Sequence, residues 1–434
     1  MNNIKNILSG KLINPVTGKK IIVPIKEIHI ESDVLHKIPA FCKAQGLGKK
    51  IAIVSDENTH IAAGAEVERM LAGESYEVFS IVLDGEGRNN VKADGDNVEM
   101  LKQYSSVVDV VIAVGSGTIS DLCKYSTFLV GKPYICVPTA PSVNGYSSAN
   151  ASIEINGVKK SLPAHLPLAI FFDIDIQVQA PYRLIVAGLG DALARSTAQT
   201  DWLLSHYIMG AEYNPLPFEI LKEDERIVFD NAEKLPLRDY ETLKALCNLS
   251  VLSGLGMFIA NSSKPASQAE HLMAHYMEMM FEGKYPHTYH GEQIAVTSIA
   301  AAKLQKEVLS MAELQVSPTF YNEKPLLTYF GQERGVEFLR ELAVKEISEE
   351  RARKINQNLR ENWTKIKNEI IPNFIMPEEL ENIIRRANGP YTYKHLGWNH
   401  TDFSQAVKHS LFMRDRFTVL DIAMIMQQDN RMVS

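Results

Sequence analysis

Three residues that could bind a metal, Asp191, His271 and His290, are widely separated in this sequence. Asp191 lies among small and apolar residues with helical spacing, where a carboxylate is costly unless a cation or hydrogen bonds compensate its charge. Two imidazoles on later segments could supply that compensation through a shared divalent ion. One carboxylate and two imidazoles leave coordination positions open, which is typical of a catalytic rather than a structural metal site.

Histidine spacing by itself supports a metal only weakly. His271 and His275 are four residues apart on an expected helix and therefore share a face. Glu270 precedes His271 and Leu272 follows it, so this is not the HExxH metalloprotease pattern. Such a pair is more often structural than metal-binding, and His290 before a glycine could simply begin a helix. The combination with the aspartate is what favours the metal site.

A glycine-rich turn follows one of the most apolar segments of the chain, Val107–Val114. Glycines in a strand-to-helix turn let backbone N–H groups approach a ligand, and the helix N-terminus favours an anion such as a pyrophosphate. The motif is neither GxGxxG nor a Walker loop, so a tight turn without a ligand is an equally good interpretation. The turn and the start of the helix comprise Gly115, Ser116, Gly117, Thr118 and Asp121.

Two further segments support a nucleotide. Asp56 follows the strand-like run Lys50–Ser55, where a carboxylate can accept hydrogen bonds from a ribose diol. The same carboxylate would repel a 2′-phosphate, which favours NAD over NADP; it could equally cap a helix starting near Thr59. The loop Pro138–Gly145 follows another strand, and α/β sheets bind ligands at the carboxyl ends of their strands.

The order of apolar patterns predicts an α/β N-terminal domain with a parallel sheet at residues 1–165 and a mostly helical C-terminal domain at residues 166–434. The charge-dense segment Glu349–Lys367 fits a solvated helix face. Strands are expected at 50–55, 76–83, 107–114 and 134–137, and helices at 62–72, 184–207, 243–260, 268–281, 292–309, 335–344 and 348–369.

Composition excludes several classes of protein. A net charge of -7 gives no drive toward nucleic acid or anionic membranes. Four scattered cysteines without a CxxC pair argue against a disulfide framework and a cysteine zinc site. The start of the chain shows no signal-peptide core, and the apolar run Leu246–Ala260 is interrupted by polar residues and is too short for a membrane span. We therefore expect a cytoplasmic protein with no nucleic-acid partner and no membrane span.

An ordered set of motifs resembles the sn-glycerol-1-phosphate dehydrogenases, within the superfamily of iron-containing alcohol dehydrogenases, glycerol dehydrogenases and dehydroquinate synthases. The resemblance covers roughly Lys49 to Ile425, and it is specific as a set rather than motif by motif. The matching segments are Gly115–Asp121 with Lys124-Tyr125, Pro138-Thr139 with Ser142, Gly188–Asp191 with Asp201-Trp202, Ser262–Ser267 with Glu270-His271, His290–Glu292 and Met413–Asp421.

The resemblance implies a dehydroquinate synthase-like fold, with an α/β N-terminal Rossmann-like domain and an all-α C-terminal domain. It also implies one divalent metal, Zn²⁺, Ni²⁺ or Fe²⁺, held by Asp191, His271 and His290. It places His275 in the catalytic site near the nicotinamide, and Asn144, Ser148 and Lys264 at the substrate. The implied contacts to NAD or NADP are made by Asp56, Gly115, Ser116, Gly117, Thr118, Asp121, Thr139 and Ser142.

Three features depart from the family pattern. Asn144-Gly145 stands where Asp-Gly is common, which puts the exact substrate in doubt. Lys264 stands where arginine is common, which weakens a bidentate contact to phosphate. The chain also carries extra helical sequence around Glu313–Asn373, for which we expect only packing or subunit contact.

The function that the resemblance implies is reversible reduction of dihydroxyacetone phosphate to sn-glycerol 1-phosphate, a step of phospholipid metabolism, in a homo-oligomer such as a dimer. The first alternative is a glycerol or other alcohol dehydrogenase without phosphate specificity. A dehydroquinate-synthase-like cyclase is disfavoured by the segment Glu270–His275, and a non-catalytic nucleotide-binding homologue is disfavoured by the intact set of metal ligands.

Overall fold

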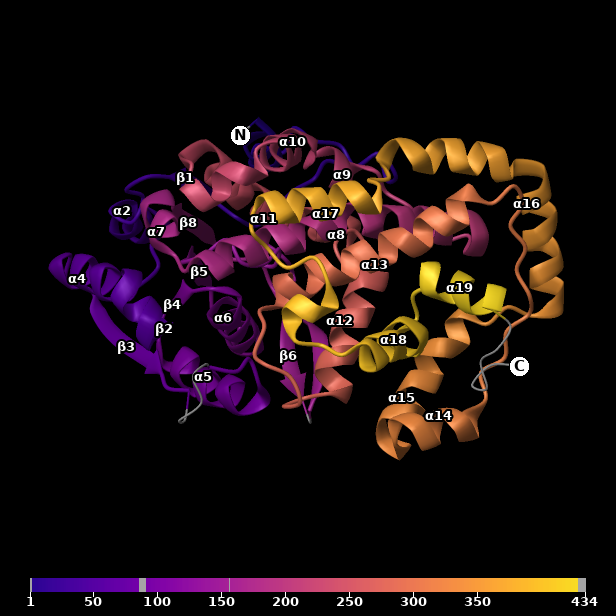
Figure 1. Ribbon diagram of the computed structural model, residues 1–434. Coiled ribbons are helices and arrows are strands. Elements are labelled where there is room, and N and C mark those ends of the chain that lie inside the picture. Colours follow the sequence, from indigo (N-terminus) through magenta and orange to yellow (C-terminus); the bar gives the residue numbers. More distant parts are fainter. Residues whose placement is uncertain (1, 86–90, 156, 428–434) are drawn as a thin grey trace. The chain divides into compact units, whose positions relative to one another are not determined.

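The computed structural model describes residues 2–85, 91–155 and 157–427 (Figure 1). The chain forms two compact units, each assembled from segments that are separated in the sequence. The first comprises Met1–Ala192, Pro215–Ser262 and Arg386–Gly389, and the second Leu193–Asn214, Ser263–Arg385 and Pro390–Ser434. The domain boundary expected at residue 165 stays a prediction.

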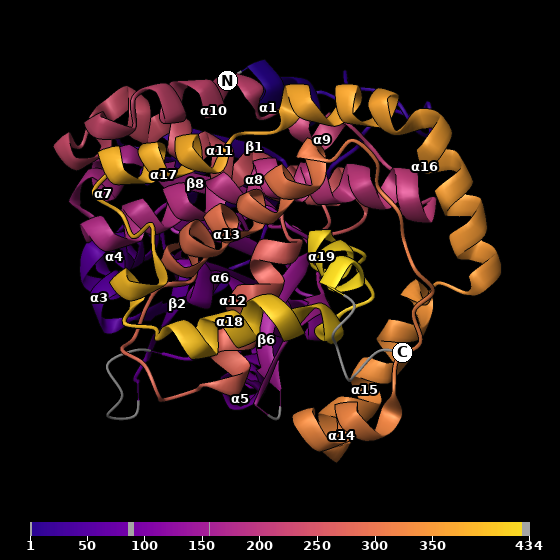
Figure 2. The same cartoon turned by 45° about the vertical axis from the view of Figure 1, so that its right-hand side comes forward.

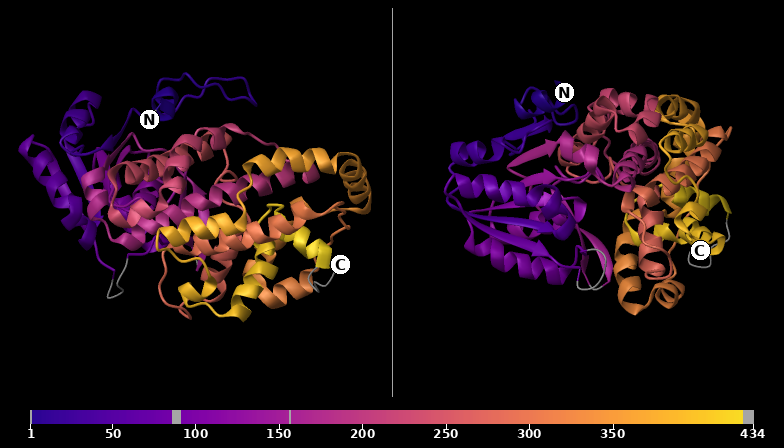
Figure 3. Two further views of the ribbon diagram at one scale, coloured as in Figure 1. Left: turned by 45° about the horizontal axis from the view of Figure 1, so that its top comes forward. Right: turned by 60° about the vertical axis from the view of Figure 1, so that its left-hand side comes forward.

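A six-stranded parallel sheet forms the centre of the first unit, with strand order β1-β8-β5-β4-β2-β3 (Figure 3). The inner strands β4, β5 and β8 are buried along their whole length, as expected of a parallel sheet covered on both faces. The four predicted strands are present, and β1 and β8 complete the sheet. The strands are β1 (Glu27–Glu31), β2 (Lys50–Asp56), β3 (Glu77–Leu83), β4 (Val110–Gly115), β5 (Tyr134–Pro138) and β8 (Ala169–Asp173).

Helices connect these strands in the crossover manner that parallel pairing requires. A separate antiparallel hairpin of β6 (Asn150–Ile155) and β7 (Val158–Pro163) follows β5. The connecting elements are α2 (Lys37–Gln45), α3 (Glu57–Thr59), the π-helix η1 (His60–Gly64), α4 (Ala65–Gly73), α5 (Gly95–Val107) and α6 (Gly117–Val130). Helix α1 (Asn2–Leu8) precedes β1, and α7 (Ile174–Gln179) follows β8.

The first unit also contains a long apolar helix, α11 (Tyr240–Ala260), whose last residue is followed by Asn261 in the left-handed conformation. It is long and apolar enough to cross a membrane, but 72% of its most apolar window is buried inside the protein. α11 therefore packs as a core helix, beside α9 (Leu216–Glu219), α10 (Lys222–Asp230) and the 3₁₀ turn η2 (Ala232–Leu237).

The named elements of the second unit among its described residues are helices, and an isolated antiparallel bridge pairs Thr319 with Ile347. The 28-residue α8 (Tyr182–Met209) enters it from the first unit, and α12 (Ala269–Met280) packs against α13 (His290–Ser310). Together with the sheet of the first unit, this confirms the predicted fold class. The remaining elements are α14 (Glu323–Phe330), α15 (Gln332–Leu342), η3 (Ala343–Lys345), α16 (Glu349–Ile370), η4 (Ile371–Asn373), α17 (Pro377–Arg386), η5 (Tyr393–Leu396), α18 (His400–His409), η6 (Ser410–Met413) and α19 (Val419–Gln427).

The extra sequence around residues 313–373 forms α14, α15 and α16 (Figure 2). Leu326, Phe338 and Trp363 join the main core of this unit, so the segment is packed into it. The buried residues of α16 recur at helical spacing along one face, while its many charges lie elsewhere. The charge-dense segment is therefore a solvated helix face, as its composition predicts.

Candidate metal centre and nucleotide-binding turn

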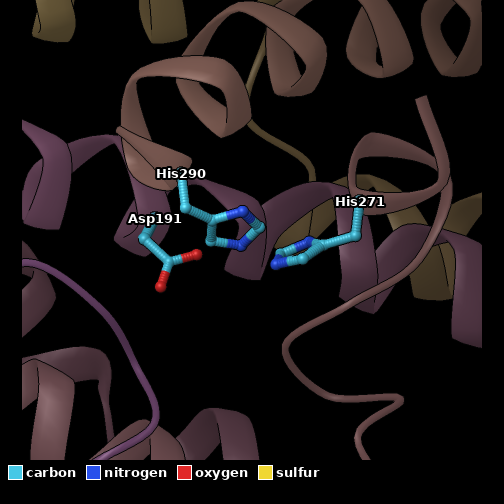
Figure 4. Close-up of side chains that lie close together, drawn as sticks. All are labelled: Asp191, His271 and His290. Carbon is cyan, nitrogen blue, oxygen red and sulfur yellow. The ribbon is translucent and has the colours of Figure 1, made fainter. Parts of the chain in front are cut away.

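The three candidate metal ligands come together in the structure. The ligand atoms of Asp191, His271 and His290 all lie within 4.8 Å of one another, and the side chains point toward one another (Figure 4). Asp191 comes from α8, His271 from the first turn of α12, and His290 is the first residue of α13. Asp191 and His271 are buried and His290 is half-buried. A buried carboxylate facing two imidazoles is a donor set that fits a divalent metal.

Asn144 lies against Asp191 and holds it. The backbone N–H of Asn144 donates to Oδ2 of Asp191 at 2.7 Å, and the side-chain Nδ2 donates to the backbone carbonyl of Asp191 at 2.9 Å. Both residues are buried. An N–H that donates to a carboxylate stabilises its ionised form. The residue that departs from the family pattern is thus part of the immediate surroundings of the candidate metal ligand.

Glu270 orients the imidazole of His271. Oε1 of Glu270 lies 2.9 Å from Nδ1 of His271, and Glu270 has no exposed surface. Burial acts to raise the pKa of Glu270, but the hydrogen bond from His271, its charge and the backbone N–H of Gln268 lower the pKa, and the net direction is downward. An ionised Glu270 accepts the proton of Nδ1, so Nε2 of His271 keeps its lone pair for a metal.

A second buried carboxylate, Asp201, lies near Glu270. Its Oδ1 accepts hydrogen bonds from Gln305 Nε2 at 2.8 Å and from the N–H of Val419 at 3.1 Å, and its Oδ2 accepts from the N–H of Ala269 at 3.2 Å. Burial, and then the charge of Glu270, raise the pKa of Asp201 to about 8. The first turn of α12 therefore carries a carboxylate held ionised, Glu270, and lies against one that readily holds a proton, Asp201.

His275 lies beside the metal ligands. Its ring centroid is 5.9 Å from that of His271 and 5.6 Å from that of His290. It is outside the group formed with Asp191, but it forms a second group with Glu278 and His290 whose ligand atoms also lie within 4.8 Å of one another. The structure thus gathers all the histidines that the sequence singled out for catalysis.

The glycine-rich turn joins the end of β4 to the start of α6. Gly115 is the last residue of β4, Ser116 is the N-cap residue, and Gly117 begins the helix. A Cβ on Gly115 would come within 2.6 Å of the Ile119 side chain, and one on Gly117 within 2.9 Å of the Val143 side chain. Close packing therefore requires both glycines, whether or not a pyrophosphate binds here.

Asp121 and Lys124 form an ion pair on α6, in which Lys124 is buried and Asp121 is half-buried. Lys124 Nζ lies 2.9 Å from Asp121 Oδ1 and also donates to the carbonyls of Gly145 and Asn150, at 2.7 and 3.0 Å. The other carboxylate oxygen of Asp121 accepts the backbone N–H of Ser152 at 3.0 Å. Asp121 therefore links α6 to the β6 segment, and its assignment to the cofactor stays a prediction.

Asp56 caps a helix in the structure. Its Oδ1 accepts the N–H of Thr59 at 2.8 Å, while Thr59 Oγ1 accepts the N–H of Asp56 at 2.9 Å. This reciprocal capping box is the interpretation that the sequence left open beside ribose binding. A carboxylate has a second oxygen, so capping does not exclude a ribose contact, which stays a prediction.

The loop after β5 is held against α8 and the glycine-rich turn. The N–H of Thr139 donates to the carbonyl of Gly115 at 3.2 Å, and Ser142 Oγ lies 3.4 Å from the hydroxyl of Tyr146. A Cβ on Gly188 of α8 would lie only 1.7 Å from the Pro141 carbonyl oxygen. Gly188 is thus the residue that lets the helix carrying Asp191 approach this loop.

The candidate substrate residues differ in their surroundings. The hydroxyl of Ser148 is buried and donates to the carbonyls of Gly145 and Asn150, at 3.0 and 2.8 Å. This geometry gives Ser148 a role in shaping the loop.

Lys264 is half-buried in a segment of the second unit that Arg416 holds. Arg416 donates to Ser263 Oγ at 2.5 Å and to the carbonyl of Ser267. Burial lowers the pKa of Arg416 to about 10, so it remains a cation at neutral pH.

Sequence reasoning placed Glu270, Asp201 and Lys124 in the matching motifs but gave them no role in supporting the site. Glu270, Asp201 and Lys124 are each fully buried, and each holds another residue named above. Their signal was a charged residue in an otherwise apolar helical pattern, which is costly unless it is paired. That signal marks a buried partner but does not identify it.

Comparison with known proteins supports one family. A family model described as iron-containing alcohol dehydrogenase matches residues 29–181. The glycerol-1-phosphate dehydrogenase, NAD(P)+, of Halalkalibacterium halodurans is 32% identical over 288 residues, which cover 65% of this chain and 71% of that protein. The enzyme of the same name from Bacillus subtilis is 27% identical over 93% of this chain and 92% of its own length.

A solved structure shows the same fold. A probable glycerol dehydrogenase from Sinorhizobium meliloti superposes with a TM-score of 0.59 at 16% sequence identity, covering 92% of this chain and 96% of that one. At this identity the likeness concerns the fold alone.

Proposed function

Because this chain belongs to the glycerol-1-phosphate dehydrogenase family of the iron-containing alcohol dehydrogenases, we propose that it reduces dihydroxyacetone phosphate to sn-glycerol 1-phosphate, reversibly. The chain is an NAD(P)-dependent oxidoreductase of a family that uses a divalent metal. The substrate, its stereochemistry and the roles of individual residues are the proposal. The observation that carries it is the convergence of Asp191, His271 and His290 on one position.

In this proposal Asp191, His271 and His290 hold the metal. When bound, the metal supplies Lewis acidity to the substrate carbonyl, and the reduced nicotinamide supplies a hydride to its carbon. The ketone, one hydride and one proton together give the secondary alcohol. Glu270 keeps the lone pair of His271 directed at the metal, and Asn144 holds the Asp191 carboxylate in place.

The proton reaches the product oxygen through groups beside the metal ligands. His275 is the titratable side chain placed for this, because its ring lies within 6 Å of both metal-binding imidazoles. We assign it to the substrate side of the site, where it passes a proton directly or through one water.

Two cationic side chains of the second unit, Lys264 and Arg416, are assigned to the binding of the substrate phosphate. Arg416 anchors the backbone on both sides of Lys264 through Ser263 and Ser267. Lys264 then acts as a point charge toward the phosphate, a weaker arrangement than a bidentate arginine.

The pyrophosphate of the cofactor is assigned to the turn Gly115–Thr118 at the N-terminus of α6. Asp56 is assigned to the adenosine ribose, which favours NAD because its charge opposes a 2′-phosphate. A comparison of Km values for NADH and NADPH in wild type and Asp56→Asn measures this preference. A larger gain for NADPH than for NADH is the expected result.

One assay tests the function. NADH absorbance is followed with dihydroxyacetone phosphate, dihydroxyacetone and glyceraldehyde phosphate, on enzyme stripped by a chelator and on enzyme reloaded with Zn²⁺, Ni²⁺ or Fe²⁺. We expect metal-dependent turnover of dihydroxyacetone phosphate and far less of the other two. Absence of turnover by metal-loaded enzyme contradicts the proposal, and equal turnover of dihydroxyacetone favours an alcohol dehydrogenase without phosphate specificity.

A further inference from the structure

The second group of metal-binding side chains lies wholly within the helical unit. The ligand atoms of His275, Glu278 and His290 lie within 4.8 Å of one another, and all three side chains are half-buried. The carboxylate and the two imidazoles are the same donor types as in the first group. Only His290 belongs to both.

The sequence explains why these side chains meet. His275 and Glu278 are three residues apart on α12, so they project from the same face of that helix. His290 begins α13, which packs against α12, and its ring lies nearly parallel to that of His275, at an interplanar angle of 26°. A histidine and a glutamate at this spacing, with a histidine from a neighbouring helix, can bind one divalent ion.

We propose that His275, Glu278 and His290 form an auxiliary site for a divalent cation, in addition to the site at Asp191. This inference rests on the proposed metal site, because the two share His290. The auxiliary site binds more weakly, since water competes more effectively for half-buried ligands than for the buried Asp191 and His271.

Sharing His290 makes the two sites antagonistic. An imidazole nitrogen donates its lone pair to one metal at a time, so an ion at Glu278 draws His290 away from Asp191 and His271. An excess of zinc therefore occupies the auxiliary site and weakens the hold on the first ion. It also engages His275, the residue assigned to proton transfer.

The test compares zinc binding to the metal-free form of four proteins by calorimetry, with the absorption spectrum of bound Co²⁺ as a second measurement. They are wild type, His271→Ala, His271→Ala with Glu278→Gln, and Glu282→Gln. Glu282 is exposed and lies four residues beyond Glu278, so its variant removes the same charge outside the proposed ligand set.

We expect wild type and Glu282→Gln to bind one tight and one weaker equivalent of zinc. His271→Ala loses the tight equivalent and keeps the weaker one, and adding Glu278→Gln removes that too. In wild type, but not in Glu278→Gln, zinc beyond one equivalent inhibits turnover.

The outcomes separate the two proposals. A wild type that binds one tight equivalent, together with a His271→Ala protein that binds none, overturns the auxiliary site and leaves the proposed function standing. A wild type that binds no tight equivalent overturns the metal site of the proposed function. Residual binding unchanged by Glu278→Gln also overturns the auxiliary site, provided that circular dichroism shows the variants folded.

Discussion

Replacing Glu270 by glutamine should weaken metal binding without disrupting the fold. Glu270 accepts three hydrogen bonds: Oε1 from His271 Nδ1 at 2.9 Å and from the N–H of Gln268 at 2.6 Å, and Oε2 from Thr197 Oγ1 at 3.0 Å. A glutamine can keep its oxygen at the Oε1 position. Its amide group then faces Thr197, whose hydroxyl can donate to the Ala194 carbonyl instead and accept from the amide. The substitution therefore removes a charge rather than a set of hydrogen bonds.

The magnitude follows from the loss of charge assistance. A hydrogen bond to an ionised group contributes about 1.5–3 kcal/mol and a neutral one about 0.5–1.5 kcal/mol, so the change is about 1–1.5 kcal/mol. This corresponds to a metal Kd roughly 5–12-fold higher, by the relation of about 1.4 kcal/mol per factor of ten. Fold stability should change little, because the hydrogen bonds to His271, Gln268 and Thr197 are kept.

Zinc affinity is measured by competition with a chromophoric chelator, and NADH affinity by fluorescence. The matched control is Asp224→Asn, which neutralises another buried carboxylate that accepts a hydrogen bond from Asn248 at 2.8 Å in the first unit. We expect a raised metal Kd in Glu270→Gln alone, with NADH binding unchanged in both variants. A metal Kd within twofold of wild type in Glu270→Gln would refute the view that this carboxylate tunes His271.

Three further predictions concern packing and charge. Gly188→Ala should lower the free energy of unfolding by about 1–3 kcal/mol and weaken NADH binding, because its Cβ would lie 1.7 Å from the Pro141 carbonyl oxygen. Denaturant titrations measure the change in stability. The control is Gly73→Ala, because a Cβ at Gly73 would have no other atom within 4 Å. Lys124→Met should cost about 3–5 kcal/mol by leaving a partly buried carboxylate without its cation, and thermal denaturation should show partial recovery when Asp121→Asn is added. The pKa of Asp201 is about 8 in the folded protein and about 4 in an unfolded chain. Between these pH values the folded state holds one more proton than the unfolded chain. The free energy of unfolding therefore falls as the pH rises from 4 to 8. Denaturant titrations measure the free energy of unfolding at pH 5 and at pH 7.5. The difference between these two values should be smaller in Asp201→Asn than in wild type, and an equal difference in both proteins would contradict the assigned pKa.

Periodicity predicted the long elements because each has a strong pattern and a clear length. The helices around Asp191 and His271 and the four predicted strands lie within a few residues of their expected bounds. The edge strand β1 was not visible, because Glu27–Glu31 is five residues long and carries two glutamates. The hairpin of β6 and β7 was not visible either, since its pairing depends on a neighbouring strand rather than on local sequence.

The candidate site was predictable as a set of residues but not as a network. Residue chemistry and the ordered family pattern selected Asp191, His271 and His290, and the fold brings them together. Spacing could not reveal that the charge of Glu270 raises the pKa of Asp201. Two of the groups that donate hydrogen bonds to Asp201 come from α13 and α19, over 100 and over 200 residues away. Such partners follow from tertiary packing, which a local pattern does not contain.

Asn144 shows how the structure changes the meaning of a departure from the family pattern. In the sequence, an asparagine in place of aspartate suggested a change at the substrate. In the structure, its amide Nδ2 donates to the backbone carbonyl of Asp191, which an ionised aspartate could not do. An aspartate at this position would instead place a second negative charge beside a carboxylate acceptor. The asparagine therefore supports Asp191 directly, and Lys264 is the residue that the proposed function assigns to the substrate phosphate.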